Sequence, residues 1–235
     1  YALATGADLE AIARLRASRV QRLLSKAAPG LAGMRIITER STAFDPSVLQ
    51  VTGDVYLEGH WQSEKYFVDI REVLIGELTL RDEPGKDERE LMERMDAVAS
   101  VSLHIRRGDY VTNPAAASFH GLCGLDYYER AIDTIKQRVI SPELFVFSDD
   151  LAWAKENLRS DLRTSFVELG PSVPDRSELR LMSCCRHHII ANSSFSWWGA
   201  WLNPRDDKVV VAPKVWYAES SMDTRDLIPT GWILQ

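Results

Sequence analysis

Two adjacent arginines, Arg106 and Arg107, follow a short apolar stretch near the middle of the chain. Residues 101–105 have the composition of a buried β-strand, and a parallel strand that carries cations at its carboxyl end can build an anion site. Arginine suits this task because its planar fork binds two phosphate oxygens and stays charged. Alternate side chains of a strand share a face, so His104 and Arg106 should point together. Arg106 is therefore the candidate ligand contact, and Arg107 is equally suited to bracing the loop.

A double arginine after a strand also occurs as a solvated loop or as an ion-pair partner of nearby carboxylates. That alternative is the better one for this stretch taken alone. A binding site is favoured by the polar residues that end three later apolar stretches, which are Asp149-Asp150, Asn192-Ser193-Ser194 and Lys214. In an open parallel sheet, ligands bind outside the carboxyl ends of the strands, so we expect these groups to surround one site.

The elements that must position these residues alternate regularly from residue 101 onward. Apolar stretches of strand type alternate with segments of helical periodicity. The expected strands are residues 101–105, 144–147, 165–169, 188–191 and 208–212, and the expected helices are 125–139, 151–158, 177–185 and one from Phe195. Such alternation is typical of an α/β fold, so we predict a parallel, Rossmann-like sheet with helices on both faces.

The polar groups at these strand ends have two interpretations each. Ser193 and Ser194 lie between a predicted strand and a predicted helix, where hydroxyls and first-turn N–H groups can hold a phosphate. The same serines could be an ordinary helix N-cap. Asp149 could accept two hydrogen bonds from the edge of a guanine base, or it could cap a helix, as could Asp150.

Composition excludes several classes of protein. The 235 residues suffice for one large or two modest domains, and 28 basic against 34 acidic residues leave a net charge of −6. That balance argues against a general nucleic-acid binder. The three cysteines (Cys123, Cys184 and Cys185) form neither a disulfide framework nor a zinc pattern, which favours a reducing compartment. No apolar stretch approaches the ~20 residues that span a bilayer.

Two familiar phosphate motifs are missing. The chain has no Asp-x-Asp pair, the usual metal clamp for a nucleotide-sugar diphosphate, and no G-x-x-x-x-G-K-[ST] loop of an ATPase or kinase. A pyrophosphate that is neutralised by arginine and a helix N-terminus needs no metal. We therefore expect a metal-independent transferase that uses a nucleoside diphosphate sugar, without a metal site or a cofactor.

At four places the chain resembles the α-1,2-fucosyltransferases of glycosyltransferase family eleven. The signature H-x-R-R-G-D-Y begins at His104, and three further blocks agree in order and spacing. They are residues 59–67 (GHWQSEKYF), 119–128 (FHGLCGLDYY) and 192–203 (NSSFSWWGAWLN). The resemblance implies a GT-B-like fold with two Rossmann-like halves, GDP-fucose bound by the C-terminal half, and transfer to the 2-hydroxyl of a terminal galactoside with inversion and without a metal.

The resemblance also implies roles for individual residues. Arg106 would bind the β-phosphate of the donor and stabilise charge on the departing GDP. His104 and Asp149 would help to hold the guanosine, and Asp109 and Tyr110 would line the loop near the transferred sugar. The full donor-binding set that we expect is His104, Arg106, Arg107, Asp149, Asn192, Ser193, Ser194 and Phe195, with Arg106 and Asp109 as catalytic residues.

The catalytic base has several candidates. Asp109, Glu64, Asp126 and His120 are all chemically able to accept a proton from a sugar hydroxyl. We favour Asp109. The alternative for Asp109 is a salt bridge that orients Arg106 or Arg107, and a positive charge developing on the sugar could also make a strong base unnecessary.

The N-terminal part reads less regularly. We expect a helix over residues 8–28, strands over 34–38 and 55–58, a helix from Ser63 and a polar hinge over 81–87. We predict an N-terminal, acceptor-side domain over residues 1–95 and a GDP-fucose-binding domain over 96–235. The family opens with a glycine-rich strand and turn that does not precede Tyr1, so we expect the first domain to lack that strand.

Two other functions fit the same residues. One is a transferase for another GDP-sugar, and the other is a catalytically silent module that binds a nucleotide or a glycan. For the leading function the expected partners are GDP-fucose and a galactose-terminated oligosaccharide, with no nucleic acid and no transmembrane segment. We expect a cytoplasmic location, with membrane association as the alternative if a targeting segment precedes Tyr1.

Overall fold

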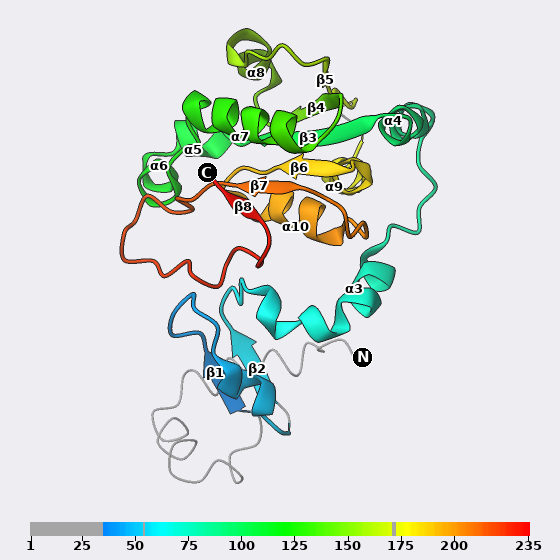
Figure 1. Ribbon diagram of the computed structural model, residues 1–235. Helices are drawn as coiled ribbons and strands as arrows, with labels where there is room; N and C mark the ends of the chain where they lie inside the picture. The colour runs from blue at the N-terminus through cyan, green and yellow to red at the C-terminus, as the bar shows by residue number, and fades with distance from the viewer. Residues whose placement is uncertain (1–34, 54, 171–172) are drawn as a thin grey trace. The chain divides into compact units, whose positions relative to one another are not determined.

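Figure 1 shows the computed structural model of the protein, which describes residues 35–53, 55–170 and 173–235. The helix expected over residues 8–28 lies outside the described residues. The chain divides into two compact units. The larger unit comprises residues 69–222 and 228–235, and the smaller one comprises the part of the chain up to Val68 together with Asp223–Leu227.

The larger unit is built on a six-stranded parallel sheet. In spatial order its strands are β5 (Thr164–Phe166), β4 (Pro142–Ser148), β3 (Ala99–Ile105), β6 (His187–Ile189), β7 (Val210–Ala212) and β8 (Ile233–Leu234). From β3 the chain first builds outward through β4 and β5, and then returns to β3 and builds the other way through β6. This is the strand order of a doubly wound Rossmann fold, with its switch point between β3 and β6.

The α/β prediction is confirmed, and all five predicted strands are present. Three of them are shorter than expected, because β5 ends at Phe166, β6 ends at Ile189 and β7 begins only at Val210. The sixth strand, β8, was not predicted. It has two residues, Ile233–Leu234, which are too few to show an alternating pattern.

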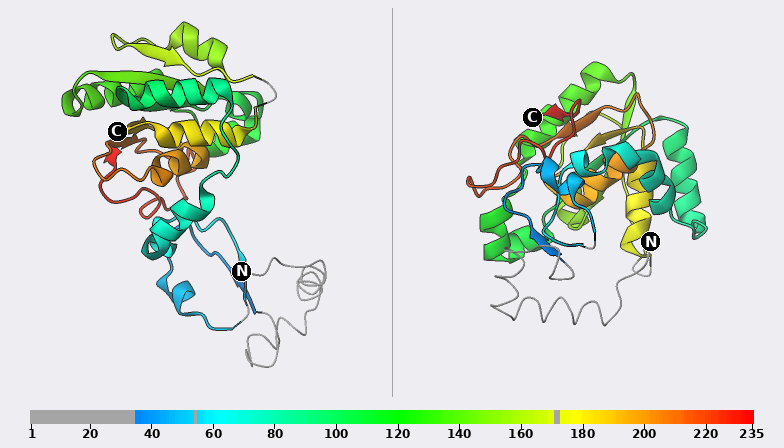
Figure 2. Two further views of the ribbon diagram at one scale, coloured as in Figure 1. Left: turned by 90° about the vertical axis from the view of Figure 1, so that its right-hand side faces the viewer. Right: turned by 90° about the horizontal axis from the view of Figure 1, so that it is seen from below.

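Helices cover both faces of this sheet (Figures 1 and 2), as predicted. On one face, α7 (Leu125–Arg138) and α8 (Leu151–Asn157) pack against Leu103 and Val146. On the other face, α4 (Lys86–Asp96) and α9 (Asp175–Cys184) pack against Phe145 and Phe147. Fully burying each large apolar side chain contributes about 1.5–3 kcal/mol, so these two layers supply most of the driving force for folding.

Helix α10 (Ser194–Leu202) packs closely on α9 because of a glycine. A Cβ atom added at Gly199 would lie 2.9 Å from the Cβ of Met182, closer than real side chains approach. The helices can therefore meet at this point only because residue 199 has no side chain. The contact fixes α10 against α9.

Two short helices that were not predicted follow β3. They are α5 (Gly108–Thr112) and α6 (Pro114–His120), and they lead into α7. Asn113 accepts hydrogen bonds from the amides of Ala115 and Ala116 and so caps α6. Helix α3 (Arg71–Leu78) and a connector over residues 79–85 precede α4. Among the described residues, no helix is long and apolar enough to cross a membrane.

The smaller unit contains a two-stranded parallel sheet of β1 (Arg35–Thr38) and β2 (Val55–Glu58), with the single-turn helices η2 (Pro46–Gln50) and η3 (Glu64–Tyr66). The segment η4 (Val68–Ile70) follows. The units divide after Val68, whereas we placed the domain boundary after residue 95. The difference arises because Met95 of α4 is fully buried against the large sheet. A second Rossmann-like half, and hence the GT-B arrangement, stays a prediction.

A buried histidine links β3 and β6 to the end of α10. In His188, Nδ1 lies 2.8 Å from the hydroxyl of Ser102, and Nε2 lies 2.7 Å from the amide nitrogen of Asn203. The Asn203 amide nitrogen can only donate, so Nε2 accepts and Nδ1–H donates to Ser102. Burial holds the pKa of His188 well below its usual value, so the ring stays neutral and both hydrogen bonds persist.

We expect His188→Ala to lower the free energy of unfolding by about 3 kcal/mol, because it leaves a cavity, leaves the buried Ser102 hydroxyl without its partner and removes one of the two hydrogen bonds that the Asn203 amide donates. Urea denaturation followed by circular dichroism measures this change. The control is His60→Ala, at an exposed position, which should alter stability by less than about 0.5 kcal/mol. If both variants unfolded at the same urea concentration, the buried network would contribute no stability.

Candidate functional site

Four of the predicted strand ends meet at one edge of the large sheet. Because all six strands are parallel, Arg106 after β3, Asp149 after β4, Ser193 after β6 and Lys214 after β7 all lie at the carboxyl edge. Strands β3 and β6 are neighbours in the sheet, so Arg106 and Ser193 flank the switch point itself. Ligands of open α/β sheets bind in that crevice. The prediction that these groups share one edge is confirmed.

The guanidinium of Arg106 is held between two carboxylates. Its Nη1 lies 3.0 Å from Oδ2 of Asp149, and its Nη2 lies 2.7 Å from Oδ1 of Asp109. The guanidinium also lies over the ring of Tyr110, 5.6 Å from the ring centre. About a third of the Arg106 side chain (34%) remains exposed, so the group is fixed in place and still reaches solvent. Arg106 is therefore an ion-pair partner of nearby carboxylates, which was the alternative to a ligand contact. The same two carboxylates also hold the cation in a fixed position at the sheet edge.

Asp149 serves as the brace of this arginine loop. Its Oδ1 accepts a hydrogen bond of 2.8 Å from the backbone N–H of Arg107, while Oδ2 faces Arg106. The alternative helix-cap role belongs to its neighbour, because Oδ1 of Asp150 accepts from the backbone N–H of Trp153 at 3.1 Å. Both oxygens of Asp149 are thus engaged within the protein. The guanine contact that we expected of Asp149 stays a prediction, with less free acceptor capacity to support it.

Arg107 points away from Arg106, as the strand periodicity predicted. Its guanidinium stacks on Trp153 at 3.7 Å from the ring centre, and its Nε lies 3.4 Å from Oδ2 of Asp150. Both partners belong to the start of α8. Arg107 therefore ties the arginine loop to α8, and this geometry favours the bracing role over the donor-binding one.

His104 lies buried at the carboxyl end of β3, with 5% of its surface exposed. Burial, assisted by the charge of Arg106, lowers its pKa to about 3, so the imidazole is neutral at physiological pH. Its Nδ1 is buried, and no described residue forms a hydrogen bond with it. The ring lies 6.0 Å from that of Phe195 in the first turn of α10. His104 can therefore offer a neutral donor or acceptor beneath the site.

The polar residues after β6 divide into two kinds. Ser193 occupies the N-cap position of α10 without forming a side-chain cap hydrogen bond, and Ser194 is exposed. Their hydroxyls and the first-turn N–H groups of α10 suit an anion. The amide of Asn192 instead donates to the carbonyl oxygens of His120 at 2.9 Å and Trp216 at 3.2 Å. Asn192 is 2% exposed, so its geometry is that of a brace.

A glutamate that the sequence analysis did not single out lies near Asp149. Glu178 of α9 is partly buried, and burial, followed by the like charges of Asp175 and Asp149, raises its pKa. No described residue forms a hydrogen bond with its carboxylate. Within the sequence, a single glutamate on a helix is indistinguishable from a solvated one. Only the sheet order, which brings α9 beside β4, could have revealed it.

The candidates for the catalytic base are separated by the structure. Asp126 is tied to Arg130 at 2.8 Å on the exposed first turn of α7, an interaction that lowers its pKa. Glu64 belongs to the smaller unit. His120 stacks on Tyr110, and burial lowers its pKa. Asp109 lies beside Arg106 with 53% of its side chain exposed, and only its Oδ1 is engaged by a described residue.

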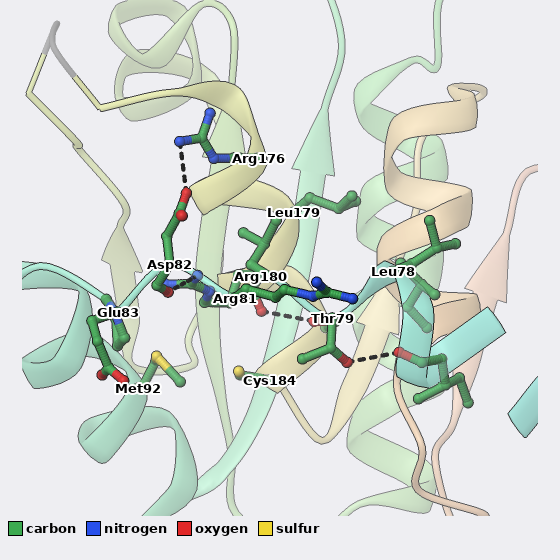
Figure 3. A pocket seen from close by; sticks show the side chains of 15 residues that line it. Leu78, Thr79, Arg81, Asp82, Glu83, Met92, Arg176, Leu179, Arg180 and Cys184 are labelled. Atoms are coloured by element: carbon green, nitrogen blue, oxygen red, sulfur yellow. Dashed lines mark hydrogen bonds and ion pairs between the residues drawn. The ribbon is translucent and has the colours of Figure 1, made fainter. Parts of the chain in front are cut away.

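A cavity of about 350 Å³ lies elsewhere in the larger unit (Figure 3). Its lining combines apolar side chains of α3 and α9, such as Leu78 and Leu179, with polar groups of the connector. The predicted hinge over residues 81–87 is held at this cavity. Asp82 pairs with Arg176 at 2.9 Å, and its carbonyl accepts from Arg180 at 2.6 Å. The cavity is separate from the carboxyl-edge site.

A Rossmann-like sheet with a preorganised arginine and a helix N-terminus at its switch point has the geometry of a domain that suits a nucleotide or a phosphate. Comparison with known proteins narrows this class. Residues 37–235 match the family model "Glycosyl transferase family 11". The chain belongs to this family, which confirms the family resemblance of its four sequence blocks.

Individual relatives agree with this membership. The chain is 39% identical over 182 residues to an Escherichia coli protein named alpha-1,2-colitosyltransferase, covering 77% of this chain and 62% of the relative. It is 46% identical over 134 residues to the E. coli O-antigen biosynthesis glycosyltransferase WbnK, covering 57% and 44%. A Mus musculus galactoside 2-alpha-L-fucosyltransferase, Sec1, is 27% identical over 160 residues, covering 65% and 43%. The chain thus spans less than two thirds of the length of each.

Proposed function

We propose that the protein is an inverting, metal-independent glycosyltransferase that moves L-fucose from GDP-fucose to the 2-hydroxyl of a terminal galactoside. The observation that carries this proposal is the position of Arg106, fixed by Asp149 and Asp109 at the switch point beside the N-terminus of α10. Relatives whose names include galactoside fucosyltransferase support the sugar and the linkage.

In this mechanism, the acceptor oxygen attacks the anomeric carbon from the face opposite the bond to the β-phosphate. The bond between the anomeric carbon and the β-phosphate oxygen breaks, and its electron pair leaves with GDP. Because the attack comes from the opposite face in a single displacement, the configuration at the anomeric carbon is inverted. Arg106 and the positive end of α10 oppose the negative charge that develops on the leaving diphosphate. Asp109 accepts the acceptor proton through Oδ2, while its Oδ1 keeps Arg106 in place.

Glu178 completes the donor site in this proposal. A carboxylate that faces the N1 and N2 edge of guanine forms a pair of hydrogen bonds that an adenine cannot supply. Glu178 lies close enough to Asp149 for their charges to interact, and no described residue uses its oxygens. Asp149, in contrast, already holds Arg106 and the backbone of Arg107. We therefore assign guanine recognition to Glu178.

Glu178→Gln is expected to weaken GDP binding about tenfold or more. The substitution removes the negative charge and replaces one of the two acceptor oxygens with an NH2 group, which cannot accept a hydrogen bond from guanine. Calorimetry with GDP and with inosine diphosphate, which lacks the N2 amine, measures the effect. The protein should prefer GDP, and the variant should lose that preference. Asp175→Asn on the same helix is the control and should retain it. If Asp149→Asn removed the preference instead, the guanine contact would belong to Asp149.

The 39% identity to a protein named colitosyltransferase favours a second candidate, in which the transferred sugar is colitose. Both candidates use the same diphosphate chemistry, so the geometry of Arg106 serves either one. Competition between GDP-fucose and GDP-colitose as donors for one acceptor separates them. The donor with the higher kcat/KM is the natural one.

The test of the main proposal is GDP release from GDP-fucose with lactose as acceptor, in the presence of EDTA. Acceptor-dependent release that survives EDTA supports transfer and its independence of metal together. GDP binding without any turnover would indicate a binding module instead. Failure to bind GDP would overturn the proposal.

A further inference from the structure

Three aromatic side chains form a contiguous group next to the arginine loop. The rings of Phe119 and Tyr217 lie 5.1 Å apart, and that of His120 lies 4.9 Å from Phe119. Tyr110 stacks on the inner side of His120, with ring centres 4.6 Å apart and planes inclined by only 5°. We call Phe119, His120 and Tyr217 the aromatic wall. Phe119 has the largest exposed fraction of the three, at 39%.

The wall is built by two segments that lie far apart in the sequence. The end of α6 supplies Phe119 and His120, and the loop after β7 supplies Tyr217; Figure 1 shows the two segments side by side. The backbone N–H of Ala218 donates to the carbonyl of Phe119 at 3.0 Å. Gly121 adopts a positive φ of 69°, and a Cβ there would lie 3.1 Å from that of Ala218. The two segments are therefore closely fitted together.

Asn192 fixes the wall to the sheet. Its buried amide donates to the carbonyls of His120 and Trp216, one residue on each segment of the wall or beside it. The carbonyl of Asn192 in turn accepts from the hydroxyl of Tyr110 at 3.3 Å. One residue at the carboxyl end of β6 thus holds both segments in register. A surface preorganised in this way can bind a ligand without first ordering its own side chains.

The wall is continuous with the proposed reaction site. Arg106 lies over Tyr110, which stacks on His120, and the charges of both Asp109 and Arg106 reach His120. An exposed aromatic surface that is edged by a carboxylate and a guanidinium matches the chemistry of a pyranose. The apolar C–H face of the sugar packs on a ring, and its hydroxyls bond to the charged groups. Burial lowers the pKa of His120, so the wall itself is uncharged at neutral pH.

We propose that Phe119, His120 and Tyr217 form the acceptor subsite, on which the pyranose ring of the acceptor galactoside stacks with its hydroxyl edge toward Asp109. This inference rests on the proposed function. We assign the wall to the acceptor because guanine recognition is assigned to Glu178 of α9, a helix that packs on β4. Tyr217 follows β7, which lies on the other side of β3 in the sheet. The sugar of the donor is the other possible source of a pyranose, and the kinetics distinguish the two.

The first test is Phe119→Ala. The variant should raise the KM for lactose about tenfold, the value of one lost aromatic contact, while the KM for GDP-fucose and the Kd for GDP stay within twofold. Phe119→Trp should restore the KM for lactose. Leu122→Ala, at a neighbouring residue that is 45% exposed, is the matched control and should change nothing. An unchanged melting temperature shows that the variants fold.

A second readout does not depend on turnover. Saturation-transfer NMR with methyl β-galactoside in the presence of GDP should show binding that Phe119→Ala and Tyr217→Ala both weaken. An unaltered signal and an unaltered KM for lactose in both variants would overturn the proposal. A rise in the KM for GDP-fucose alone would assign the wall to the donor sugar and overturn it equally. Failure of the unmodified protein to bind GDP would instead count against the proposed function.

Discussion

Arg106→Ala is expected to lower kcat/KM at least ~10³-fold, the largest effect of any single substitution in the site. Arg106 is the cation at the switch point whose position two carboxylates define. The negative charge on the leaving diphosphate grows as the bond to the sugar breaks, so the guanidinium stabilises the transition state more than the bound donor. The measurement is steady-state GDP release, together with the Kd for GDP from calorimetry.

Two further variants make this expectation specific. Arg106→Lys keeps the charge but loses the fork that holds Asp149 and Asp109 at once, so we expect it to recover only a small part of the activity. Arg107→Ala removes the stack on Trp153 and should mainly lower the melting temperature, with a smaller effect on kcat/KM. Equal losses of activity in Arg106→Ala and Arg107→Ala, at equal stability, would contradict the division of labour that the structure indicates.

Much of this site could be predicted from the sequence because it depends on two simple periodicities. Residues that end buried parallel strands must share an edge, and this rule alone brings Arg106, Asp149 and Ser193 together. Alternation along a strand separates Arg106 from Arg107. Neither inference needs the order of the strands, which the sequence pattern does not specify. Family resemblance then supplied the chemistry for which these positions are suited.

The remainder depends on packing between distant segments, which local patterns do not encode. Asp149 and Asp150 are equivalent in the sequence, and only the end of β4 and the start of α8 decide that Asp150 caps the helix. Glu178 lies near Asp149 because α9 packs on β4, the strand that Asp149 follows. We predicted a domain boundary after residue 95, but the structural units divide after Val68. The sequence shows that α4 has an apolar face, but it does not show which sheet this face covers.

Gly108 shows how closely the arginine loop depends on such packing. The residue starts α5, and its φ lies outside the positive range in which glycine is needed. Backbone conformation therefore permits alanine at this position. A Cβ there, however, would lie 2.6 Å from Oδ2 of Asp149, the oxygen that pairs with Arg106. The absence of a side chain at residue 108 is what lets the brace and the arginine meet.

Gly108→Ala is accordingly expected to lower kcat/KM about 100-fold while it leaves the fold intact. The carboxylate of Asp149 must turn away from the new methyl group, which loosens both its bond to Arg107 N–H and its pair with Arg106. Gly76→Ala in α3 is the matched control, because a Cβ there meets nothing within 4 Å and should stabilise the helix slightly. GDP release and the melting temperature measure the two effects. If Gly108→Ala kept full activity, the position of Arg106 would not depend on Asp149, and the preorganised cation on which the mechanism rests would have to be abandoned.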